Sequence, residues 1–592
     1  MPTINDRKKI YAHRASDFAK STEKYRKLVR NTNLARGATF LVGTAISIIV
    51  VNYSLPLMFV AIAISVITFL YFIKKNADYE KLYTFNSTMN AINTNELKSL
   101  ENDNSNFDGG NELIDTSHNF SYDLDIFGNN SIFQMINRTC TAGGKQRLAN
   151  QFKKPSTNIN EIKQIQDDSA IFANELELRQ QFCAFGKIYT SDFDKTPDFS
   201  SVEFQFTNTK IWQLVSIALI VSTCAAILLA CMDLCSPYIG LLLYLVQIAL
   251  VSVNSKKTNK LSKLLEGGSK TLHKYEKLFE TIGKIPHQPS KYANFSTGHV
   301  SNALRQLAQI ASFYEQRSNM MVLMFGQGIM LYDININIKF EKWLRKYSNE
   351  IPQWFAMAHE YDYMLSLANL RYNHPEWCVP QPTEAKFILN AKSAGHPLLN
   401  PDKMVCNDIN FSNCTFLTIL TGANMAGKST YLRTIGVNLI LAQIGAVVCA
   451  KEFIFSPTEI ATSIRTSDSV QDNESYFFAE LKRLQKIVNR LENGETLFVI
   501  VDEMLRGTNS KDKHDGSKKF IEKLLKYSCY GIFATHDIDI GNLRNTYPQN
   551  VNAKCFEISF EGDNLIFDYK IKDGISQNLN ASYLMRKMGI IE

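Results

Sequence analysis

The chain has 592 residues, 45% hydrophobic and 20% charged, with a formal net charge of +7. A chain of this length is too long for one hydrophobic core and indicates roughly three or four folded units. Its eleven cysteines are scattered without C-x-x-C spacing or a Cys/His cluster, which fits reduced thiols in the cytosol and suggests no cysteine-based metal site.

The excess positive charge lies in residues 1–36, which hold ten Lys and Arg against Asp6, Asp17 and Glu23. Beside a membrane helix such a segment suits an anionic lipid leaflet, at about 1 kcal/mol per basic residue near the surface. A nucleic-acid-binding arm is the alternative interpretation. Because the remaining residues are neutral overall, charge gives no independent indication of DNA binding.

Four uncharged apolar runs follow in two close pairs. A helix needs about 20 apolar residues to cross the hydrocarbon of a bilayer, with a range of about 17–25. The first run is marginal in length and the other three qualify. Buried core helices are the alternative, but two such pairs are hard to hide inside a soluble domain. The runs are 38–53, 55–73, 211–232 and 237–253.

The two pairs predict two membrane hairpins. The first pair is separated by Ser54, with Pro56 close behind, and the second by residues 233–236. Basic residues flank the outer ends, so the positive-inside rule places both tips away from the cytoplasm. A long charged segment precedes the first run, so no cleavable signal peptide is expected. The prediction is a multi-pass protein of the inner (cytoplasmic) membrane with its soluble domains in the cytoplasm. The flanking residues are Arg30, Arg36, Lys74, Lys75, Lys210, Lys256, Lys257 and Lys260.

The rest of the chain is first helical and then rich in β-structure. Apolar residues recur at three- and four-residue spacing up to about residue 372, and short β-rich runs alternating with helices follow from about residue 387. The predicted units are a basic arm (1–36), a first hairpin (37–75), a polar linker (76–120), a helical core in two parts (121–210 and 254–380), a second hairpin (211–253) and an α/β domain with a C-terminal helical segment (385–592).

The segment GANMAGKS, residues 422–429, satisfies the phosphate-binding pattern G-x-x-x-x-G-K-[ST]. It follows a predicted buried strand, 416–421, and precedes a helix that begins near Lys428. The glycines let the backbone turn so that successive N–H groups and the helix N-terminus point at phosphate. Lys428 can reach the β and γ oxygens of ATP, and Ser429 can ligate Mg²⁺.

Two further strands are expected to end at the same place. TLFVIVDEM reads as a strand of a parallel sheet buried on both faces, and it ends in Asp502 and Glu503. Asp502 would hold the Mg²⁺ shell, and Glu503 would polarise the attacking water. The strand CYGIFAT ends before His536, which can sense the γ-phosphate or position water. A helix-capping role is the alternative for His536, but the other two strands favour the nucleotide.

These segments resemble the MutS-type ATPases of DNA mismatch repair and recombination control. Residues 421–430, TGANMAGKST, are similar to the family's TGPNMxGKST, with Ala423 in place of proline. Residues 502–509, DEMLRGTN, are similar to DEIGRGTS, with Leu505 in place of a glycine. ATHD resembles the family's TTH segment, and AGHPLL resembles GRHPxL.

The likeness covers roughly residues 120–210 and 255–592, with the second hairpin inserted in the helical core. Ser475, Phe477 and Glu480 match the serine-containing signature GRSTFxxEM, while Asn473-Glu474 replaces its Gly-Arg. The implied fold is an α/β P-loop NTPase domain with a mostly parallel sheet, beside an all-α core or lever domain.

The resemblance also implies a dimer, with ATP and Mg²⁺ bound at the ATPase interface. Ser475 would approach the γ-phosphate of the partner subunit. Glu503 would support hydrolysis and His536 would report on it. Met404 and Val405 occupy the place of apolar residues that pack on adenine. The residues that would bind phosphates and Mg²⁺ in cis are Gly422, Ala423, Asn424, Met425, Ala426, Gly427, Lys428, Ser429 and Thr430, with Asp502 as the second metal ligand.

Family members that read mismatches carry an N-terminal domain with a G-x-F-Y-E wedge. This chain begins instead with the basic arm and the first hairpin. SFYEQ, residues 312–316, lacks the preceding glycine and falls within a predicted helix. Mismatch recognition by the usual wedge is therefore not expected.

Three functions remain open. The first is a membrane-anchored, homodimeric MutS-like ATPase that binds duplex, mismatched or branched DNA in mismatch repair or recombination. The second is an ATPase of the same family that acts on a protein or membrane partner. The third is a transporter half, disfavoured because the apolar runs carry no charge to mark a pathway and an LSGGQ signature is absent.

Overall fold

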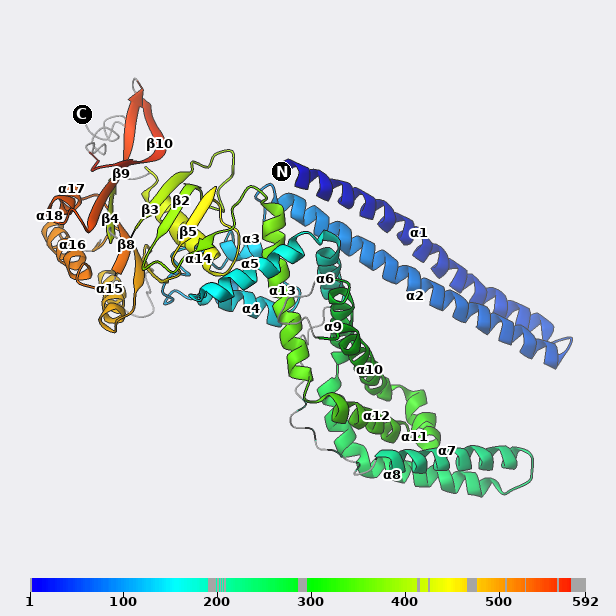
Figure 1. Ribbon diagram of the computed structural model, residues 1–592. Coiled ribbons are helices and arrows are strands. Elements are labelled where there is room, and N and C mark those ends of the chain that lie inside the picture. Colours follow the sequence, from blue (N-terminus) through cyan, green and yellow to red (C-terminus); the bar gives the residue numbers. More distant parts are fainter. Residues whose placement is uncertain are drawn as a thin grey trace.

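The computed structural model describes residues 3–189, 199, 202, 204, 206, 209–285, 295–412, 416–423, 426–465, 476–505, 508–527, 529–561 and 564–576. An α/β domain lies at one end of a long helical frame (Figure 1). Two helical hairpins leave the frame at different places and extend toward the same side of the molecule. By length and composition alone, four of the described helices could cross a membrane, and they are the four helices of these hairpins.

The first hairpin consists of α1 (Ile4–Val50) and α2 (Leu55–Ser99). Thr3 caps α1 reciprocally with Asp6, which fixes the helix start. The two helices meet through small and polar side chains. Thr32 Oγ1 donates to Asn76 Oδ1 at 2.7 Å, and a Cβ added at Gly43 would lie 2.4 Å from Ser65 Oγ.

Two expectations about this region need correction. Residues 4–36 of the basic segment form about the first two-thirds of α1 rather than a separate arm. The linker expected from residue 76 does not begin there, because α2 continues to Ser99. Residues 76–99 are a polar but largely half-buried part of the helix that packs on α1 and α6, and they contain no proline or glycine that would end the helix.

The base of the first hairpin is docked on the frame by buried polar groups. The carboxylate of Glu96 pairs with Arg138 at 2.5 Å and accepts from Asn373 Nδ2 at 2.9 Å. Tyr11 of α1 donates to the carbonyl oxygen of the Asn373 side chain at 2.7 Å. Both hairpin helices are thereby fixed to the end of α13 (Ile351–Asn373) that leads into the α/β domain.

The frame is built on α13, whose side chains are buried along most of its length. Asp362 in α13 accepts from the backbone N–H of Cys140 and Thr141, which holds the start of α4 against it. The segment 312–315 lies in the last turn of α10. The helices of the frame are α3 (Ile132–Ile136), α4 (Ala142–Lys153), α5 (Ile159–Ala173), α6 (Leu176–Ile188), α9 (Gly268–Ile282), α10 (Thr297–Glu315), α11 (Gln327–Met330), α12 (Tyr332–Tyr347) and α13.

The second hairpin leaves the end of the frame that is distal to the α/β domain (Figure 1). It consists of α7 (Thr209–Cys231) and α8 (Pro237–Leu265), which adjoin α11 and α12. Phe206 and Val251 pack with Leu331, Ile334 and Ile338 where the hairpin meets the frame.

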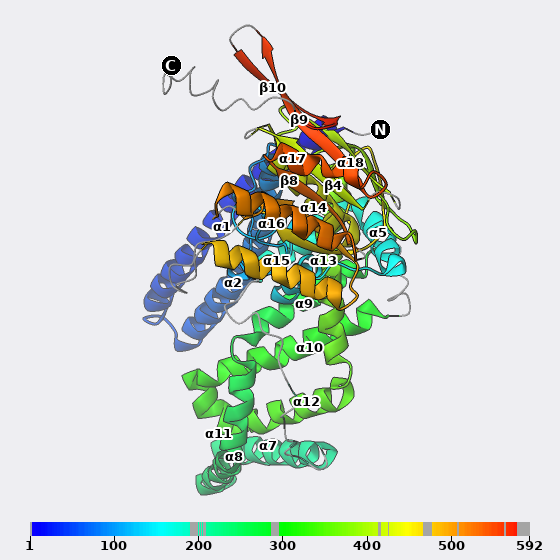
Figure 2. The same ribbon diagram turned by 90° about the vertical axis from the view of Figure 1, so that its left-hand side faces the viewer.

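The α/β domain contains two sheets. The larger has the order β10-β9-β4-β8-β7-β6, in which only the β10–β9 pair is antiparallel. The central strands β4, β7 and β8 are buried along their whole length, as predicted for a parallel sheet covered on both faces. Helices α14, α15 and α16 pack with this sheet (Figure 2).

The bounds in the larger sheet are β4 (Leu417–Gly422), β6 (Glu459–Ser463), β7 (Leu497–Asp502), β8 (Cys529–Thr535), β9 (Val551–Glu561) and β10 (Asn564–Asp573). The smaller sheet, of order β1-β5-β2-β3, contains β1 (Gln381–Pro382), β2 (Leu389–Ala394), β3 (Asn407–Phe411) and β5 (Glu452–Phe455). The helices of the domain are α14 (Lys428–Gln443), α15 (Tyr476–Glu492), α16 (Ser510–Leu524), α17 (Ile538–Gly541) and α18 (Leu543–Thr546).

Candidate nucleotide site

The loop between β4 and α14 depends on two glycines. Gly422 has φ 143° and Gly427 has φ 104°, both in the region that side chains with a Cβ disfavour. A Cβ at Gly422 would also lie 2.6 Å from the carbonyl oxygen of Phe556. The two glycines therefore allow the tight turn that connects β4 to the start of α14 at Lys428.

Lys428 is buried at the mouth of this loop. Its Nζ donates to the carbonyl oxygens of Gly422 at 2.6 Å and Ala423 at 3.0 Å, and lies 3.3 Å from His536 Nδ1. The ammonium is thus held between the ends of β4 and β8.

Ser429 and Asp502 are in direct contact. Ser429 Oγ donates to Asp502 Oδ2 at 2.5 Å, which joins the start of α14 to the end of β7. A hydroxyl oxygen beside a carboxylate oxygen is the kind of hard donor pair that Mg²⁺ prefers. The residues present therefore fit the expected metal.

Glu503 and His536 form a second pair beside it. The Glu503 carboxylate contacts His536 Nε2, while His536 Nδ1 lies 3.0 Å from the carbonyl oxygen of Gly422. Glu503 has φ 51°, and its N–H donates to the carbonyl oxygen of Ala534 at 2.9 Å. A left-handed conformation at a non-glycine residue is held by its surroundings and is common at functional sites.

A cavity of about 640 Å³, large enough for a small-molecule ligand, opens over Lys428, Ser429, Asp502 and Glu503, whereas His536 is not among the described residues that line it. Its apolar and aromatic wall includes Val405, Tyr431 and Tyr569. Met404 is not among the described residues that line it; its sulfur lies 3.9 Å from Cys449 Sγ. The full lining is Ala394, His396, Leu399, Lys403, Val405, Asn407, Ala423, Gly427, Lys428, Ser429, Thr430, Tyr431, Thr434, Asp502, Glu503, Phe556 and Tyr569.

Sequence reasoning missed Tyr569. Asn407 Nδ2 donates to the backbone carbonyl of Tyr569 at 2.9 Å, which ties β10 to the start of β3. A Cβ added at Gly427 would lie 3.2 Å from the Tyr569 ring, so this ring lies directly over the loop. No motif marks Tyr569, because only the β9–β10 hairpin brings a residue so far along the chain to the cavity.

His396 is another residue of the cavity wall without a predicted role. Burial lowers its pKa to about 4, and the nearby charge of Arg433 acts in the same direction. His396 Nδ1 accepts from the N–H of Leu398 at 3.3 Å, as a neutral ring can. The imidazole is therefore an uncharged part of the wall at neutral pH.

Three residues predicted for the site, Asn424, Met425 and Ser475, lie outside the described residues. Glu480, which matches the same signature as Ser475, is buried in α15 and accepts from the N–H of Leu505 at 2.5 Å. This bond fixes the turn that follows Asp502 and Glu503.

The site is tied to the helical frame by ion pairs. Asp125, which precedes α3, pairs with Arg433 of α14 at 2.7 Å and with Arg465 after β6 at 2.5 Å. Neighbouring Asp123 accepts from Thr462 Oγ1 at 2.7 Å and from the N–H of Ile464 at 3.0 Å. The helix that begins at the loop is thus joined directly to the frame.

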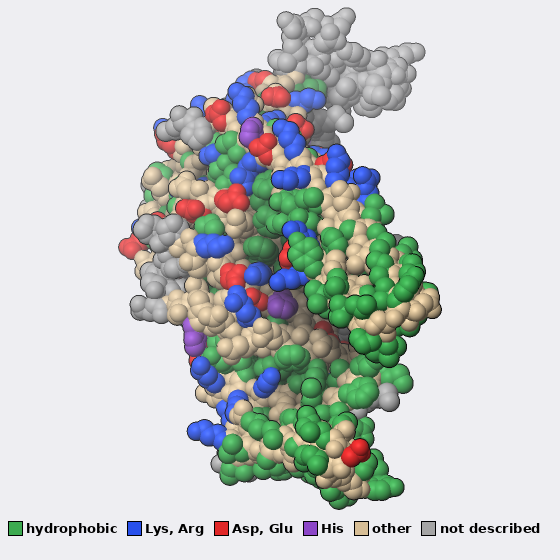
Figure 3. All heavy atoms as spheres, turned by 90° about the vertical axis from the view of Figure 1, so that its right-hand side faces the viewer, with side chains coloured by type: hydrophobic (Ala, Val, Ile, Leu, Met, Phe, Trp, Pro, Cys, Tyr) green, Lys and Arg blue, Asp and Glu red, His purple; other side chains and the backbone are tan. Residues whose placement is uncertain are grey.

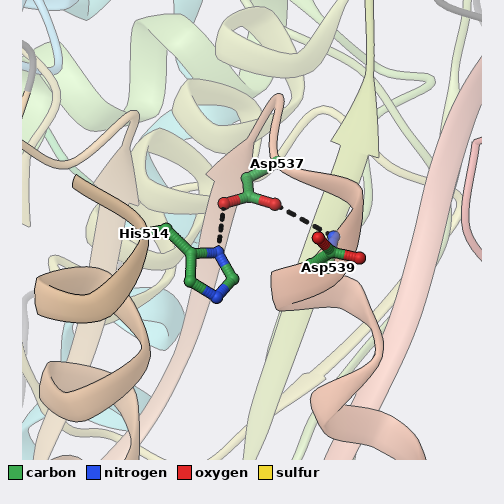
Figure 4. A group of neighbouring side chains, drawn as sticks. All are labelled: His514, Asp537 and Asp539. Carbon is green, nitrogen blue, oxygen red and sulfur yellow. Dashed lines mark hydrogen bonds and ion pairs between the residues drawn. The ribbon is translucent and has the colours of Figure 1, made fainter. Parts of the chain in front are cut away.

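A separate group of ligand-type side chains is His514, Asp537 and Asp539 (Figure 4), the one such group of three found among the described residues. His514 Nδ1 contacts Asp537 Oδ2 at 2.6 Å, and this bond raises the pKa of His514. The other Asp537 oxygen accepts from the N–H of Asp539 and caps α17. These contacts give the group a structural role in joining α16 to α17.

Comparison with known proteins points to one family. Residues 418–588 match the family model of MutS domain V. A DNA mismatch repair protein MutS of Thermotoga petrophila is 32% identical over 227 residues, which are 38% of this chain and 28% of that protein. The mouse MutS protein homolog 4 is 33% identical over 202 residues, covering 32% of this chain and 21% of its own length. A Staphylococcus aureus MutS is 28% identical over 296 residues, 48% of this chain and 33% of that protein. The chain therefore spans about a fifth to a third of the length of these relatives.

Proposed function

Because the chain belongs to the MutS family, we propose that it binds and hydrolyses ATP with Mg²⁺ in the cavity above the 422–430 loop. The observation that carries this proposal is that groups following β4 and β7 line one cavity, while His536 after β8 contacts two of them, Lys428 and Glu503. Lys428 Nζ lies 3.3 Å from His536 Nδ1, His536 contacts Glu503, and Ser429 donates to the neighbouring Asp502.

The proposed roles follow from these contacts. The N-terminus of α14 and the loop N–H groups bind phosphate oxygens, and Lys428 moves from the loop carbonyls to those oxygens. Ser429 and Asp502 hold Mg²⁺, which when bound offsets the negative charge of the phosphates. Glu503 orients and polarises the attacking water, and His536 holds the Glu503 carboxylate in place.

The adenine end of the cavity is proposed to lie between Val405 and Tyr569. An aromatic ring and an aliphatic side chain can cover the two faces of a flat base. Met404, which the sequence pattern also suggested, is not among the described lining residues and has no part in this proposal.

A partner subunit and a membrane complete the proposal. MutS proteins typically act as dimers on DNA, and in a homodimer Ser475 would reach the γ-phosphate held by the partner. The hairpins have the polarity expected of membrane helices, with polar groups inside and apolar groups outside. Gln247 Nε2 donates to Thr223 Oγ1 at 2.6 Å between α7 and α8, whereas Leu242 is 63% exposed.

Both hairpins present their apolar surfaces on one side of the molecule. Figure 3 shows this side, where hydrophobic side chains gather over the projecting hairpins. We propose that the hairpins insert in the cytoplasmic membrane, that the soluble domains face the cytoplasm, and that the basic part of α1 before its apolar run lies near anionic lipid.

DNA is the proposed substrate polymer, since several similar proteins are named for DNA mismatch repair. We predict that the detergent-solubilised protein binds duplex, mismatched or branched DNA with salt-dependent affinity. Contacts to several phosphates give a slope of log K against log salt of about −3 or steeper. A slope near zero in fluorescence-anisotropy titrations would exclude DNA.

A protein or membrane partner is the second candidate, and the placement of the second hairpin favours it. The end of the frame distal to the nucleotide site carries α7 and α8, with Leu214 and Leu242 among the exposed apolar side chains. In this alternative, ATP hydrolysis would change the position of the second hairpin relative to its protein or membrane partner, and no nucleic acid would be bound.

The hydrolytic role is tested by Glu503→Ala. This variant should keep Mg²⁺-dependent ATP binding within about threefold of the wild type but lose at least 100-fold in turnover, because water is no longer polarised. Single-turnover assays with radiolabelled ATP measure both quantities. Glu384→Ala, which removes an exposed carboxylate elsewhere in the domain, should behave as the wild type. Normal hydrolysis by Glu503→Ala would show that another group polarises the water.

A further inference from the structure

An uncharged segment of the frame, residues 319–331, lies against the second hairpin. It runs from a turn through a π-helical stretch, Val322–Gly326, into α11. Its sequence, NMMVLMFGQGIML, contains no charged residue. Thirteen residues are too few to cross a bilayer but suit a segment that enters and leaves it on the same side.

The outer surface of this segment is apolar and exposed. The side chains of Met320, Met321, Leu323, Phe325 and Met330 are each more than half exposed. So many large apolar side chains exposed within one short segment are unusual on a soluble surface and mark a site of association. The nearest apolar surface is that of α7 and α8, with which α11 is in contact.

The depth of the segment follows from one close contact. Gly328 packs on Tyr244 of α8 so closely that an added Cβ would lie 2.0 Å from the ring. Tyr244 is about 18 Å along the helix from Lys256, the first basic residue after the apolar run, and about 10 Å from Pro237 at the tip. Suppose that the cytoplasmic boundary of the hydrocarbon lay between Gly328 and the hairpin tip, so that Gly328 stayed outside the bilayer. Only about 10 Å of α8, from Tyr244 to Pro237, would then lie in a hydrocarbon layer about 30 Å thick. A spanning second hairpin therefore takes this segment into the bilayer with it.

Both ends of the segment lie beside charged residues near the basic end of the apolar run of α8, away from the hairpin tip. Arg317 pairs with Asp333 at 2.7 Å, and Arg317 Nη2 donates to Asn259 of α8 at 3.1 Å. Asn259 lies among Lys256, Lys257 and Lys260, the residues expected at the cytoplasmic surface. The chain thus leaves the charged boundary at Arg317 and comes back to it at Asp333.

Backbone groups at both ends of the segment, where the helical bonding is interrupted, have partners, as insertion in hydrocarbon requires. Asn319 accepts through its side chain from the N–H of Met321 at 3.0 Å and through its carbonyl from Leu323 at 3.0 Å. At the other end, Asn335 Nδ2 donates to the carbonyl oxygen of Met330 at 2.7 Å.

We propose that residues 319–331 form a re-entrant segment inserted among phospholipid acyl chains beside the second hairpin. The inference rests on the proposed membrane insertion and adds a third membrane element that hydropathy over a spanning window does not reveal. The membrane part at the distal end of the frame would then consist of α7, α8 and residues 319–331, packed together through Gly328 and Tyr244.

The test uses the full-length protein in liposomes that contain a phospholipid with a photoactivatable diazirine in its acyl chain. After irradiation, mass spectrometry locates the adducts. Residues 319–331 should be labelled within about twofold of residues 239–246 of α8. The exposed apolar side chains of Val379 and Ile454 in the α/β domain serve as the internal control and should carry less than a tenth of that label.

A matched pair of variants tests the apolar face. Phe325→Lys should lower labelling of residues 319–331 at least threefold while labelling of 239–246 stays unchanged, because a charge resists insertion. Ile454→Lys should change neither. Unchanged labelling in Phe325→Lys would contradict insertion through this face.

The outcomes separate this inference from membrane anchoring itself. Label on 239–246 without label on 319–331 would overturn the re-entrant segment and leave the hairpin in the membrane. This result would also be expected if a second copy of the chain covered the segment. Absence of label from both regions would instead overturn the proposed membrane insertion.

Discussion

At the scale of single residues, the candidate nucleotide site combines groups that sequence patterns mark with groups that only the fold brings together. Lys428, Ser429 and Asp502 stand at strand ends that carry recognisable motifs, and because parallel strands end at one edge, their meeting could be predicted. Tyr569 and His396 carry no such signal, since they reach the cavity from the β9–β10 hairpin and from the segment after β2.

The buried His396 should make the stability of the α/β domain depend on pH. Its pKa is about 4 in the folded protein and about 6.5 in an unfolded chain. Between these values the unfolded state binds more protons, so stability is fully present above pH 6.5 and is lost as the pH falls toward 4. At pH 5.5 the loss should be about 1 kcal/mol, or about 2–4 °C in the unfolding midpoint.

The variant His396→Asn isolates this contribution. It keeps an acceptor near the N–H of Leu398 but does not titrate in this range. Differential scanning calorimetry at pH 7.5 and 5.5 should show a smaller midpoint difference for the variant than for the wild type. Equal differences in the two proteins would mean that His396 is protonated as readily in the folded state as in the unfolded chain.

At the scale of elements, the apolar parts of the hairpin helices could be predicted from the sequence, but the polar continuation of α2 to Ser99 could not. Uncharged runs reveal where a helix can meet lipid, but nothing in residues 76–99 shows whether a polar stretch is loop or helix. Glu96 decides this, because its buried pairing with Arg138 gives the end of α2 a fixed partner on the frame. Burial favours protonation of Glu96, but Arg138 and the hydrogen bonds from Asn373 and Asn369 outweigh it, and the pKa of Glu96 is lowered.

Removing this carboxylate should loosen the base of the first hairpin. In Glu96→Ala the guanidinium of Arg138 stays buried without its carboxylate partner, which typically costs about 3–5 kcal/mol. Hydrogen exchange of backbone amides in residues 90–99 should accelerate at least tenfold, as measured by mass spectrometry. Glu101→Ala, an exposed carboxylate just beyond the same helix, should exchange as the wild type does. Unchanged exchange in Glu96→Ala would show that the hairpin base is held by other contacts.

At the scale of the whole molecule, the candidate nucleotide site and the two apolar hairpins are all attached to the helical frame. Asp125 joins the helix at the phosphate loop to the frame, and the frame carries the first hairpin at its near end and the second at its far end. Sharp changes in composition along the chain mark the apolar runs, the helical stretches and the β-rich part in their order. Their spatial arrangement could not be predicted, since it depends on ion pairs between residues hundreds of positions apart, such as Asp125 with Arg433 and Arg465.

The central claim is that this one cavity binds the triphosphate, and Lys428 tests it most directly. Equilibrium binding of a fluorescent ATP analogue to the solubilised protein, with and without Mg²⁺, should show Mg²⁺-dependent affinity in the wild type. In Lys428→Ala the affinity should fall at least 100-fold, while Lys403→Ala at the cavity rim should lose less than tenfold. The account would be contradicted if the wild-type protein did not bind the ATP analogue with Mg²⁺, or if the Lys428→Ala variant bound it with wild-type affinity.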